Sequence, residues 1–482
     1  MLTMVLSQTK KIIVAMETRQ MKTTRRQFVQ GSMCAGLPGL SDNEAVARPT
    51  SPESPDIVFI MADDMGHADL SCYGRNGPST KHIDSLATDG IQMNFAYANS
   101  CVCSATRTGL ITGRYQYRLP LGLEEPLASF GEHIGLPVAH PTLPSLLRNL
   151  GYSTSLVGKW HLGGVPNHGP LQHGYDRFWG IYGGATDYFS HKLGLPDMPN
   201  DSIIDGAVPV HSVGYLTDLL GKKAAAGIGT LAASPKPYFL SLHFTAPHWP
   251  WEGPEDAAAS GAIADPRHQD GGNIATYHAM LKAMDDNVGR VLAAVARSPR
   301  AANTIVIFTC DNGGERFSDT WPLLGHKGEL LEGGIRVPLL VRWPKQIKAG
   351  QRSDQVTMSM DWLPTLLDAA RSRPHPDYPS DGISILNALR GGGTTERKLY
   401  WRYKAHDQAA MRDGKWKYLK LGAKEHLFDI EADQREQADL QNREATRFAE
   451  MREAFAAWNK SMLPYPPDSF SEDVSKIYTD RY

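Results

Sequence analysis

The stretch DIVFIMADD, residues 56–64, is a short apolar run that ends in two aspartates. Three more β-branched or aromatic runs also end in polar groups: 153–157 before Gly158-Lys159-Trp160-His161, 238–244 before Ala246-Pro247-His248, and 304–309 before Asp311-Asn312-Gly313-Gly314. Runs of this length, bounded by turn residues, predict strands. Helical patterns lie between them, as in 277–292, where apolar residues recur four apart. Strands that alternate with helices predict an α/β fold, with a large, mostly parallel sheet sandwiched by helices.

The polar residues after these four runs are expected to lie close together. In sheets of this kind the binding crevice lies outside the carboxyl ends of the strands. Asp63, Asp64, Asp311 and Asn312 form an all-oxygen set, which suits Ca²⁺ or Mg²⁺ and not zinc. Residues 311–314 alone are equally typical of a simple turn. Their pairing with Asp63-Asp64 at another strand end favours the metal site.

Length and charge limit the classes of partner. The 482 residues are 41% apolar and 21% charged, which is enough for one large domain or two moderate ones. The net charge of -2 offers no basic surface for nucleic acid or anionic membranes. No apolar stretch approaches the roughly 20 residues that span a bilayer. An anionic substrate must therefore be held by local cations.

The N-terminal region has the form of an export signal. Residues 24–29, TRRQFV, contain a twin-arginine pair, followed by a weakly apolar segment and a small-x-small site at 45–47. We predict a Tat-type signal over 1–47 and a periplasmic or secreted bacterial protein. A start at Met21 would leave residues 1–20 untranslated. The alternatives are a basic tail or, less favoured, a lipoprotein anchor at Cys34.

Five cysteines are too few for a disulfide framework in a chain of this length, and the pair 101 and 103 lacks the second pair of a zinc site. Cys103 is expected in the first turn of a helix that continues through Arg107 to Gly113. Free N–H groups at such a helix end favour an anion. Taken alone, Cys103 is an activated nucleophile or a small buried hydrophobe.

Cys103-Ser104-Ala105-Thr106-Arg107, continued by Leu110-x-Thr112-Gly113-Arg114, resembles the signature of the type I sulfatases, an arylsulfatase-like family of the alkaline phosphatase superfamily. The family motif reads Cys-x-Pro-Ser-Arg and then Leu-x-Thr-Gly-Arg, so Ala105 and Thr106 depart from it. The resemblance implies that the cysteine is oxidised to formylglycine. One hydroxyl of the hydrated aldehyde attacks sulfur, and the other expels sulfate. Cys103 is preferred to Cys101 because only Cys103 has an arginine four residues later.

The resemblance covers nearly the whole mature chain and implies roles for further residues. The matching blocks are 158–163, 246–250 and 325–328. The implied metal ligands are Asp63, Asp64, Cys103 as formylglycine, Asp311 and Asn312. The implied catalytic residues are Cys103, Arg107 to orient the aldehyde hydrate, Lys159 and Lys327 to neutralise sulfate, His161 to assist deprotonation, and His248 with Lys327 to protonate the leaving oxygen. His243, within its strand, is expected in the core.

The resemblance thus predicts hydrolysis of an aryl or carbohydrate sulfate ester, with Ca²⁺ or Mg²⁺ and a formylglycine-generating or anaerobic sulfatase-maturating enzyme as partner. The alternatives are a phosphate or phosphonate monoester hydrolase, or a catalytically silent protein that binds sulfated glycans. Residues 182–188 and 249–251 are candidate pocket walls. We predict a catalytic domain over 54–390 and, after a glycine linker, a C-terminal subdomain over 394–482. Short antiparallel strands at 401, 411–418 and 427–430 and a closing helix at 444–458 are expected there.

Overall fold

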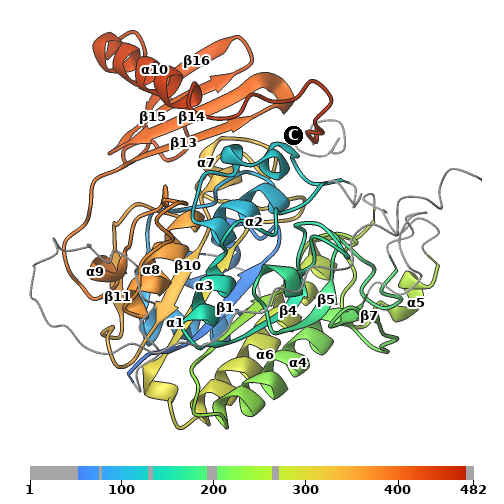
Figure 1. Ribbon diagram of the computed structural model, residues 1–482. Coiled ribbons are helices and arrows are strands. Elements are labelled where there is room, and N and C mark those ends of the chain that lie inside the picture. The colour runs from blue at the N-terminus through green and yellow to red at the C-terminus, as the bar shows by residue number, and fades with distance from the viewer. Residues whose placement is uncertain (1–52, 75–78, 129–133, 193–202, 263–270, 474–482) are drawn as a thin grey trace, which may run out of the picture. The chain divides into compact units, whose positions relative to one another are not determined.

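The computed structural model describes residues 53–74, 79–128, 134–192, 203–262 and 271–473, and these described residues belong to one compact unit (Figure 1). The export signal predicted over 1–47 lies outside the described residues and stays a prediction. Within the described ranges, no helix has both the length and the apolar character needed to cross a membrane.

A ten-stranded sheet forms the centre of the fold, in the order β11-β2-β10-β9-β1-β8-β4-β5-β6-β7. Its five central strands are parallel: β9 (Thr304–Cys310), β1 (Asp56–Ala62), β8 (Tyr238–His243), β4 (Ser153–Lys159) and β5 (Arg177–Ile181). Antiparallel pairs join β10 (Leu339–Arg342), β6 (Ile204–Asp205) and β7 (Val208–Pro209) to these, and β2 (Ile91–Met93) and β11 (Gln351–Ser353) complete the other edge. The prediction of a mostly parallel sheet is confirmed, and all four predicted strands belong to its parallel centre.

Helices cover both faces of this sheet, because every residue of β1 is buried and successive side chains point to opposite faces. Val58 and Ile60 pack in one core with α1 (Lys81–Thr88), α4 (Leu216–Ala232) and α6 (Ile274–Ala296). Ile57 and Phe59 pack in the other with α2 (Cys103–Thr112), α3 (Leu143–Asn149), α8 (Trp362–Ala369) and α9 (Leu386–Leu389). The helix predicted at 277–292 lies within α6. Smaller elements are α5 (Ala257–Ser260), α7 (Glu332–Ile335) and a parallel pair of β3 (Ala96–Tyr97) with β12 (Thr357–Met358).

The C-terminal part of the chain forms a separate antiparallel sheet whose strands follow in chain order: β13 (Lys398–Tyr403), β14 (Gln408–Asp413), β15 (Trp416–Leu421) and β16 (Lys424–Asp429). The stretch 411–418 contains the turn between two of these strands, where Gly414 has a φ of 59°. Helix α10 (Ala445–Asn459) packs on the sheet through Met451. Trp401 joins the sheet to the rest of the unit, since its Nε1 donates to the Ala98 carbonyl at 2.8 Å. The small antiparallel sheet closed by a helix is therefore confirmed, and the domain boundary at 391–393 stays a prediction.

Candidate active site

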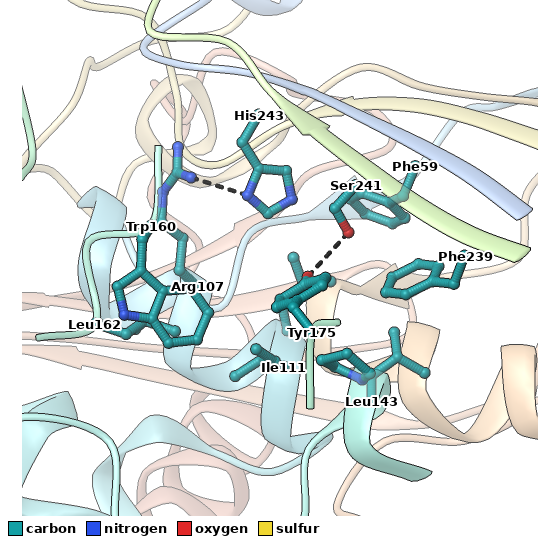
Figure 2. Close-up of a pocket in the computed structure, with 12 residues that line it drawn as sticks. Phe59, Arg107, Ile111, Leu143, Trp160, Leu162, Tyr175, Phe239, Ser241 and His243 are labelled. Carbon is teal, nitrogen blue, oxygen red and sulfur yellow. Dashed lines mark hydrogen bonds between the residues drawn. The ribbon is translucent and has the colours of Figure 1, made fainter. Parts of the chain in front are cut away.

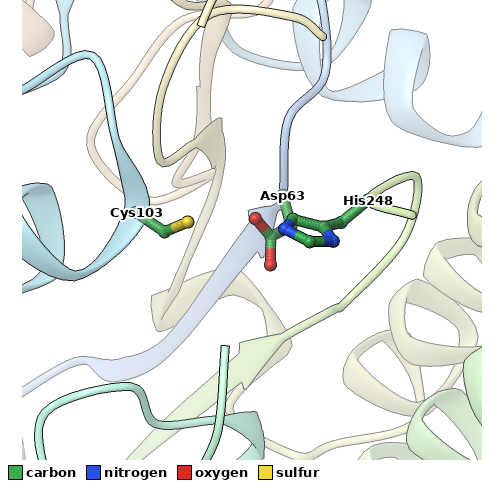
Figure 3. Close-up of side chains that lie close together, drawn as sticks. All are labelled: Asp63, Cys103 and His248. Carbon is green, nitrogen blue, oxygen red and sulfur yellow. The ribbon is translucent and has the colours of Figure 1, made fainter. Parts of the chain in front are cut away.

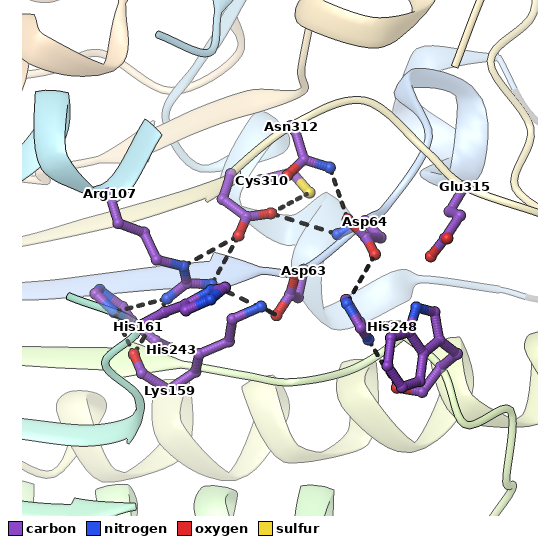
Figure 4. Close-up of polar contacts among 12 residues, drawn as sticks. Asp63, Asp64, Arg107, Lys159, His161, His243, His248, Cys310, Asn312 and Glu315 are labelled. Carbon is purple, nitrogen blue, oxygen red and sulfur yellow. Dashed lines mark hydrogen bonds and ion pairs between the residues drawn. The ribbon is translucent and has the colours of Figure 1, made fainter. Parts of the chain in front are cut away.

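The carboxyl ends of the parallel strands bring their polar residues to one edge of the sheet, as expected (Figure 4). Neighbouring strand ends are joined through the backbone, because the N–H of Asp63 donates to Ala246 O at 3.1 Å and that of Asp311 donates to Ala62 O at 3.3 Å. Helix α2 and the loop before α7 add side chains to the same place. The residues collected here are all buried: Asp63, Asp64, Cys103, Arg107, Lys159, His161, His248, Asp311, Asn312 and Lys327.

Three carboxylates form the centre of the site. Oxygen atoms of Asp63, Asp64 and Asp311 lie within 4.8 Å of one another. Burial and the charge of Asp311 raise the pKa of Asp63 to about 8. Although burial opposes it, the ammonium group of Lys327 holds the pKa of Asp64 well below its usual range. The ionised form of Asp63 is therefore less stabilised by its neighbours than that of Asp64, and an added cation would favour it.

The donor set of this cluster fits a divalent cation. Asp63 Oδ1 and Asn312 Oδ1 are buried and have no hydrogen-bond partner among the described residues. The Asn312 amide is fixed, since its Nδ2 donates to Asp64 Oδ1 at 2.7 Å and to Gly313 O at 2.9 Å. Asp64 has a φ of 61°, a left-handed conformation that is uncommon for a residue other than glycine and typical of functional sites. Oxygen-only ligands of this kind suit Ca²⁺ or Mg²⁺.

Three cations surround the carboxylates. Arg107 donates to Asp311 Oδ2 from Nε at 3.1 Å and from Nη2 at 2.8 Å, and its Nη1 donates to Lys159 O at 3.1 Å. Lys159 Nζ lies 2.5 Å from Asp63 Oδ2, and Lys327 Nζ lies 2.6 Å from Asp64 Oδ2. Their charges make the site able to hold a tetrahedral oxyanion beside the carboxylates.

Cys103 occupies the first turn of α2, as predicted, and is 1% exposed. Its Sγ and ligand atoms of Asp63 and His248 lie within 4.8 Å of one another (Figure 3). Burial raises the pKa of the thiol to about 12, which disfavours an unmodified thiolate nucleophile. Cys101, by contrast, packs in an apolar cluster with Tyr97 and Ile335. The structure thus places Cys103, and not Cys101, at the carboxylates.

Two histidines flank the cluster. His161 Nε2 lies 3.0 Å from Leu127 O, and the residue has a left-handed φ of 59°. His248 Nδ1 lies 2.7 Å from Trp249 O, while its Nε2 lies 3.4 Å from Asp64 Oδ2. Burial holds the pKa of both histidines well below the ordinary value, so both are neutral at pH 7. Because a carbonyl only accepts, the proton sits on Nε2 of His161 and on Nδ1 of His248.

The structure adds one residue that sequence reasoning missed. Glu315 is 3% exposed, and its Oε2 lies 3.7 Å from Lys327 Nζ. It follows directly after residues 311–314, and that adjacency was its only signal. His243 is buried, as expected, and its Nδ1 also lies 3.3 Å from Arg107 Nη1.

Each of the two candidate pocket walls contains an aromatic residue that is buried. Tyr188 is fully buried and stacks on Tyr215 at 5.4 Å between ring centroids, so it supports the site from within and is not an open wall. Trp251 is also buried and packs edge-on against Phe317. Behind Arg107 and His243 lies a cavity of about 20 Å³, which has room for a water molecule and none for a substrate (Figure 2).

Comparisons with known proteins agree with this geometry. Residues 55–372 match the family model described as Sulfatase, and residues 326–457 match the one described as N-sulphoglucosamine sulphohydrolase, C-terminal. The chain is 31% identical to N-acetylgalactosamine-6-sulfatase of Sus scrofa, covering 76% of this chain and 72% of the relative. It is also 31% identical to human arylsulfatase A, covering 79% of this chain and 76% of that one.

Among solved structures, Ps i-CgsB in complex with k-i-k-neocarrahexaose superposes with a TM-score of 0.78 at 28% identity, covering 88% of this chain and 96% of that one. The two family models together span residues 55–457, from the parallel sheet into the C-terminal sheet. The chain therefore belongs to the sulfatase family and is a sulfuric ester hydrolase.

Proposed function

We propose that this hydrolase acts through Cys103 converted to formylglycine and through one divalent cation, Ca²⁺ or Mg²⁺, held by Asp63, Asp64, Asp311 and Asn312. One observation carries the proposal. Cys103 Sγ lies beside a buried carboxylate cluster that has two unpaired oxygens and is ringed by three cations. The unpaired oxygens of this cluster can coordinate a cation, and the three positive side chains can hold an anionic ester next to residue 103.

The two groups would supply what the side chains lack. Formylglycine provides a hydrated aldehyde with two hydroxyls, and the cation offsets the carboxylate charge and attracts ester oxygens. Arg107, held by Asp311 and by the Lys159 carbonyl, orients residue 103. The ammonium groups of Lys159 and Lys327 donate to sulfate oxygens.

We assign the proton transfers to His161, His248 and Lys327. His161 carries its proton on Nε2, so Nδ1 has the lone pair that can take a proton from residue 103. Although burial opposes it, Asp64 and Glu315 hold the pKa of Lys327 well above its usual range, so this lysine is protonated when substrate arrives. Lys327, with His248 beside it, donates the proton to the leaving oxygen.

We also propose a carbohydrate sulfate as the substrate class. The relatives named above include an N-acetylgalactosamine-6-sulfatase, and Ps i-CgsB was solved with an oligosaccharide. The fold is shared over most of both chains, which supports a saccharide but does not select its sulfated position.

The test combines turnover with chemistry at residue 103. The purified protein is assayed with an aryl sulfate, sulfated saccharides, and the matched aryl phosphate and phosphonate, and peptide 99–107 is weighed by mass spectrometry. We expect sulfate turnover together with the mass of an aldehyde at Cys103. Faster turnover of the phosphate or phosphonate would favour the alternative hydrolase, and glycan binding without turnover would favour a silent binding protein.

The maturing enzyme can be tested separately, because Ala105 stands where the family motif has proline. Co-expression with a formylglycine-generating or an anaerobic sulfatase-maturating enzyme should raise the aldehyde fraction and the activity in parallel. Ala105→Pro should raise the aldehyde fraction with the formylglycine-generating enzyme. Activity that is independent of the aldehyde fraction would contradict the proposed nucleophile.

A further inference from the structure

The loop that carries Lys327 lies against the C-terminal sheet. Two backbone hydrogen bonds hold it to the catalytic side: Lys327 N donates to Gly314 O at 2.9 Å, and Gly328 N donates to Cys101 O at 3.0 Å. Two further backbone groups of the loop, Gly328 O and Leu330 N, point the other way and need partners of their own.

Both groups are bound by one side chain of the C-terminal sheet. Gln408, the first residue of β14, is 4% exposed. Its Oε1 accepts from Leu330 N at 2.9 Å, and its Nε2 donates to Gly328 O at 2.9 Å. Both ends of the planar amide therefore bind backbone groups within the three residues that follow Lys327, which fixes the orientation of Gly328 and Leu330, and Nε2 also donates to Ala405 O at 3.3 Å.

The next residues of the same segment are held by a buried charge cluster. Lys417 of β15 is fully buried, and its Nζ lies 3.0 Å from Glu332 Oε1 and 2.8 Å from Glu436 Oε1. Glu332 N donates to Glu436 Oε2 at 2.7 Å, and Tyr97 donates to Glu332 Oε2 at 2.7 Å. Moving this cluster would leave buried charges unpaired, so β14 and β15 provide a rigid support for the segment 328–332.

We propose that Gln408 is a positioning residue for Lys327. The inference rests on the proposed role of Lys327 as proton donor to the leaving oxygen. The lysine side chain is long and loses rotamer freedom when its Nζ is held at the site. A loop fixed directly after Lys327 leaves the side chain fewer positions to sample. The C-terminal sheet would thereby act on the chemical step without contacting substrate.

The test uses a matched pair of buried glutamines. Gln408→Met keeps the length of the side chain and removes both hydrogen bonds to the loop. Gln355 is 1% exposed and likewise bridges backbone groups, since its Oε1 accepts from Thr395 N at 2.7 Å and its Nε2 donates to Val356 O at 2.8 Å. Gln355→Met therefore controls for the loss of a buried bridging amide elsewhere in the fold.

The readout is the dependence of kcat on leaving-group pKa across a series of aryl sulfates. We expect Gln408→Met to reduce kcat by about 10- to 100-fold for the poorest leaving group, the size of effect that a small misplacement causes. The best leaving groups need little protonation and should lose only a few-fold, so the slope steepens. Gln355→Met should lower the thermal midpoint to a similar extent without changing the slope.

A double mutant completes the test. In a Lys327→Ala background, Gln408→Met should cause no further loss, because the group that it positions is absent. An unchanged slope in Gln408→Met, or the same change in Gln355→Met, would overturn the inference. If Gln408→Met does not fold, Gln408→Asn keeps the amide but is one methylene shorter, and the same comparison applies.

The outcomes for the two proposals differ. A wild-type protein with no sulfate turnover, or a Lys327→Ala variant with an unchanged slope, would count against the proposed function itself. Wild-type turnover with a slope that changes in Lys327→Ala and not in Gln408→Met would reject only the role of Gln408.

Discussion

Cys101 and Cys103 are two residues apart and lie in different surroundings. Cys103 begins α2 and faces the carboxylates, whereas Cys101 packs in an apolar cluster. The separation arises because Val102, between them, is extended and the helix starts at the next residue. Two similar thiols therefore have different chemical roles available to them.

From this we predict that Cys103→Ser removes nearly all turnover, whereas Cys101→Ala retains the chemical step. A serine hydroxyl can accept sulfate but lacks the second hydroxyl that releases it. The measurement is steady-state turnover together with intact mass, which should show a sulfated serine after incubation with substrate. Equal loss in both variants would contradict the assignment of Cys103.

The unpaired oxygens of Asp63 and Asn312 lead to a second prediction at this scale. Chelation should abolish turnover, and Ca²⁺ or Mg²⁺ should restore it. Added ion should also raise the thermal midpoint of unfolding. An ion that binds only the folded state, at a concentration of 100 times its Kd, adds about 2.7 kcal/mol to the free energy of unfolding. Asp64→Asn should weaken this shift, and Na⁺ at matched ionic strength is the control. Full activity in rigorously metal-free protein would refute the cation site.

At the scale of elements, the loops after β5 and β8 support His248 together. Tyr188 donates through its hydroxyl to His248 O at 2.9 Å, and its backbone N–H donates to Glu252 Oε2 at 3.0 Å. Burial, and to a lesser degree Asp187, raises the pKa of Glu252 to about 7. The ionised form of Glu252 is thus disfavoured in the folded state.

The expected consequence is a pH-dependent stability. A carboxyl whose folded pKa lies above its unfolded value of 4.5 contributes stability that is full at low pH and is lost as pH rises to about 7. The free energy of unfolding of Glu252→Gln, measured relative to that of the wild type, should therefore increase by up to about 3 kcal/mol between pH 4.5 and pH 8. Denaturant unfolding at both pH values measures this. If the difference in free energy of unfolding between the variant and the wild type is the same at pH 4.5 and at pH 8, Glu252 does not titrate in this range.

For the whole molecule, export is the remaining prediction from the sequence. Arg25→Lys combined with Arg26→Lys should retain the protein in the cytoplasm, because Tat recognition depends on the arginine pair. The measurement is the ratio of periplasmic to cytoplasmic protein in a fractionated bacterial host. The change Lys22→Arg, which lies after Met21 and outside the arginine pair, controls for effects of nearby basic residues. Unchanged periplasmic yield in the double variant would contradict the signal.

The local sequence determined the positions of the candidate site residues along this chain. An apolar run directly before Asp63 or Asp311 defines a buried strand and the polar residue at its end, and both properties are read from adjacent residues. Parallel pairing then brings such ends to one edge, so the parallel sheet, the start of α2 and the collection of site residues were predictable.

Tertiary structure alone decided which groups meet and how deeply they are buried. Arg107 pairs with Asp311, 204 residues away, because of the strand order and the packing of α2. The residues next to Arg107 and Asp311 in the sequence predict neither the strand order nor this packing. The same holds for the burial of Tyr188 and for the contact of Gln408 with the Lys327 loop. Partner choice and desolvation depend on the whole three-dimensional arrangement, because an isolated segment exposes its polar groups to water and leaves their pKa values and partners open.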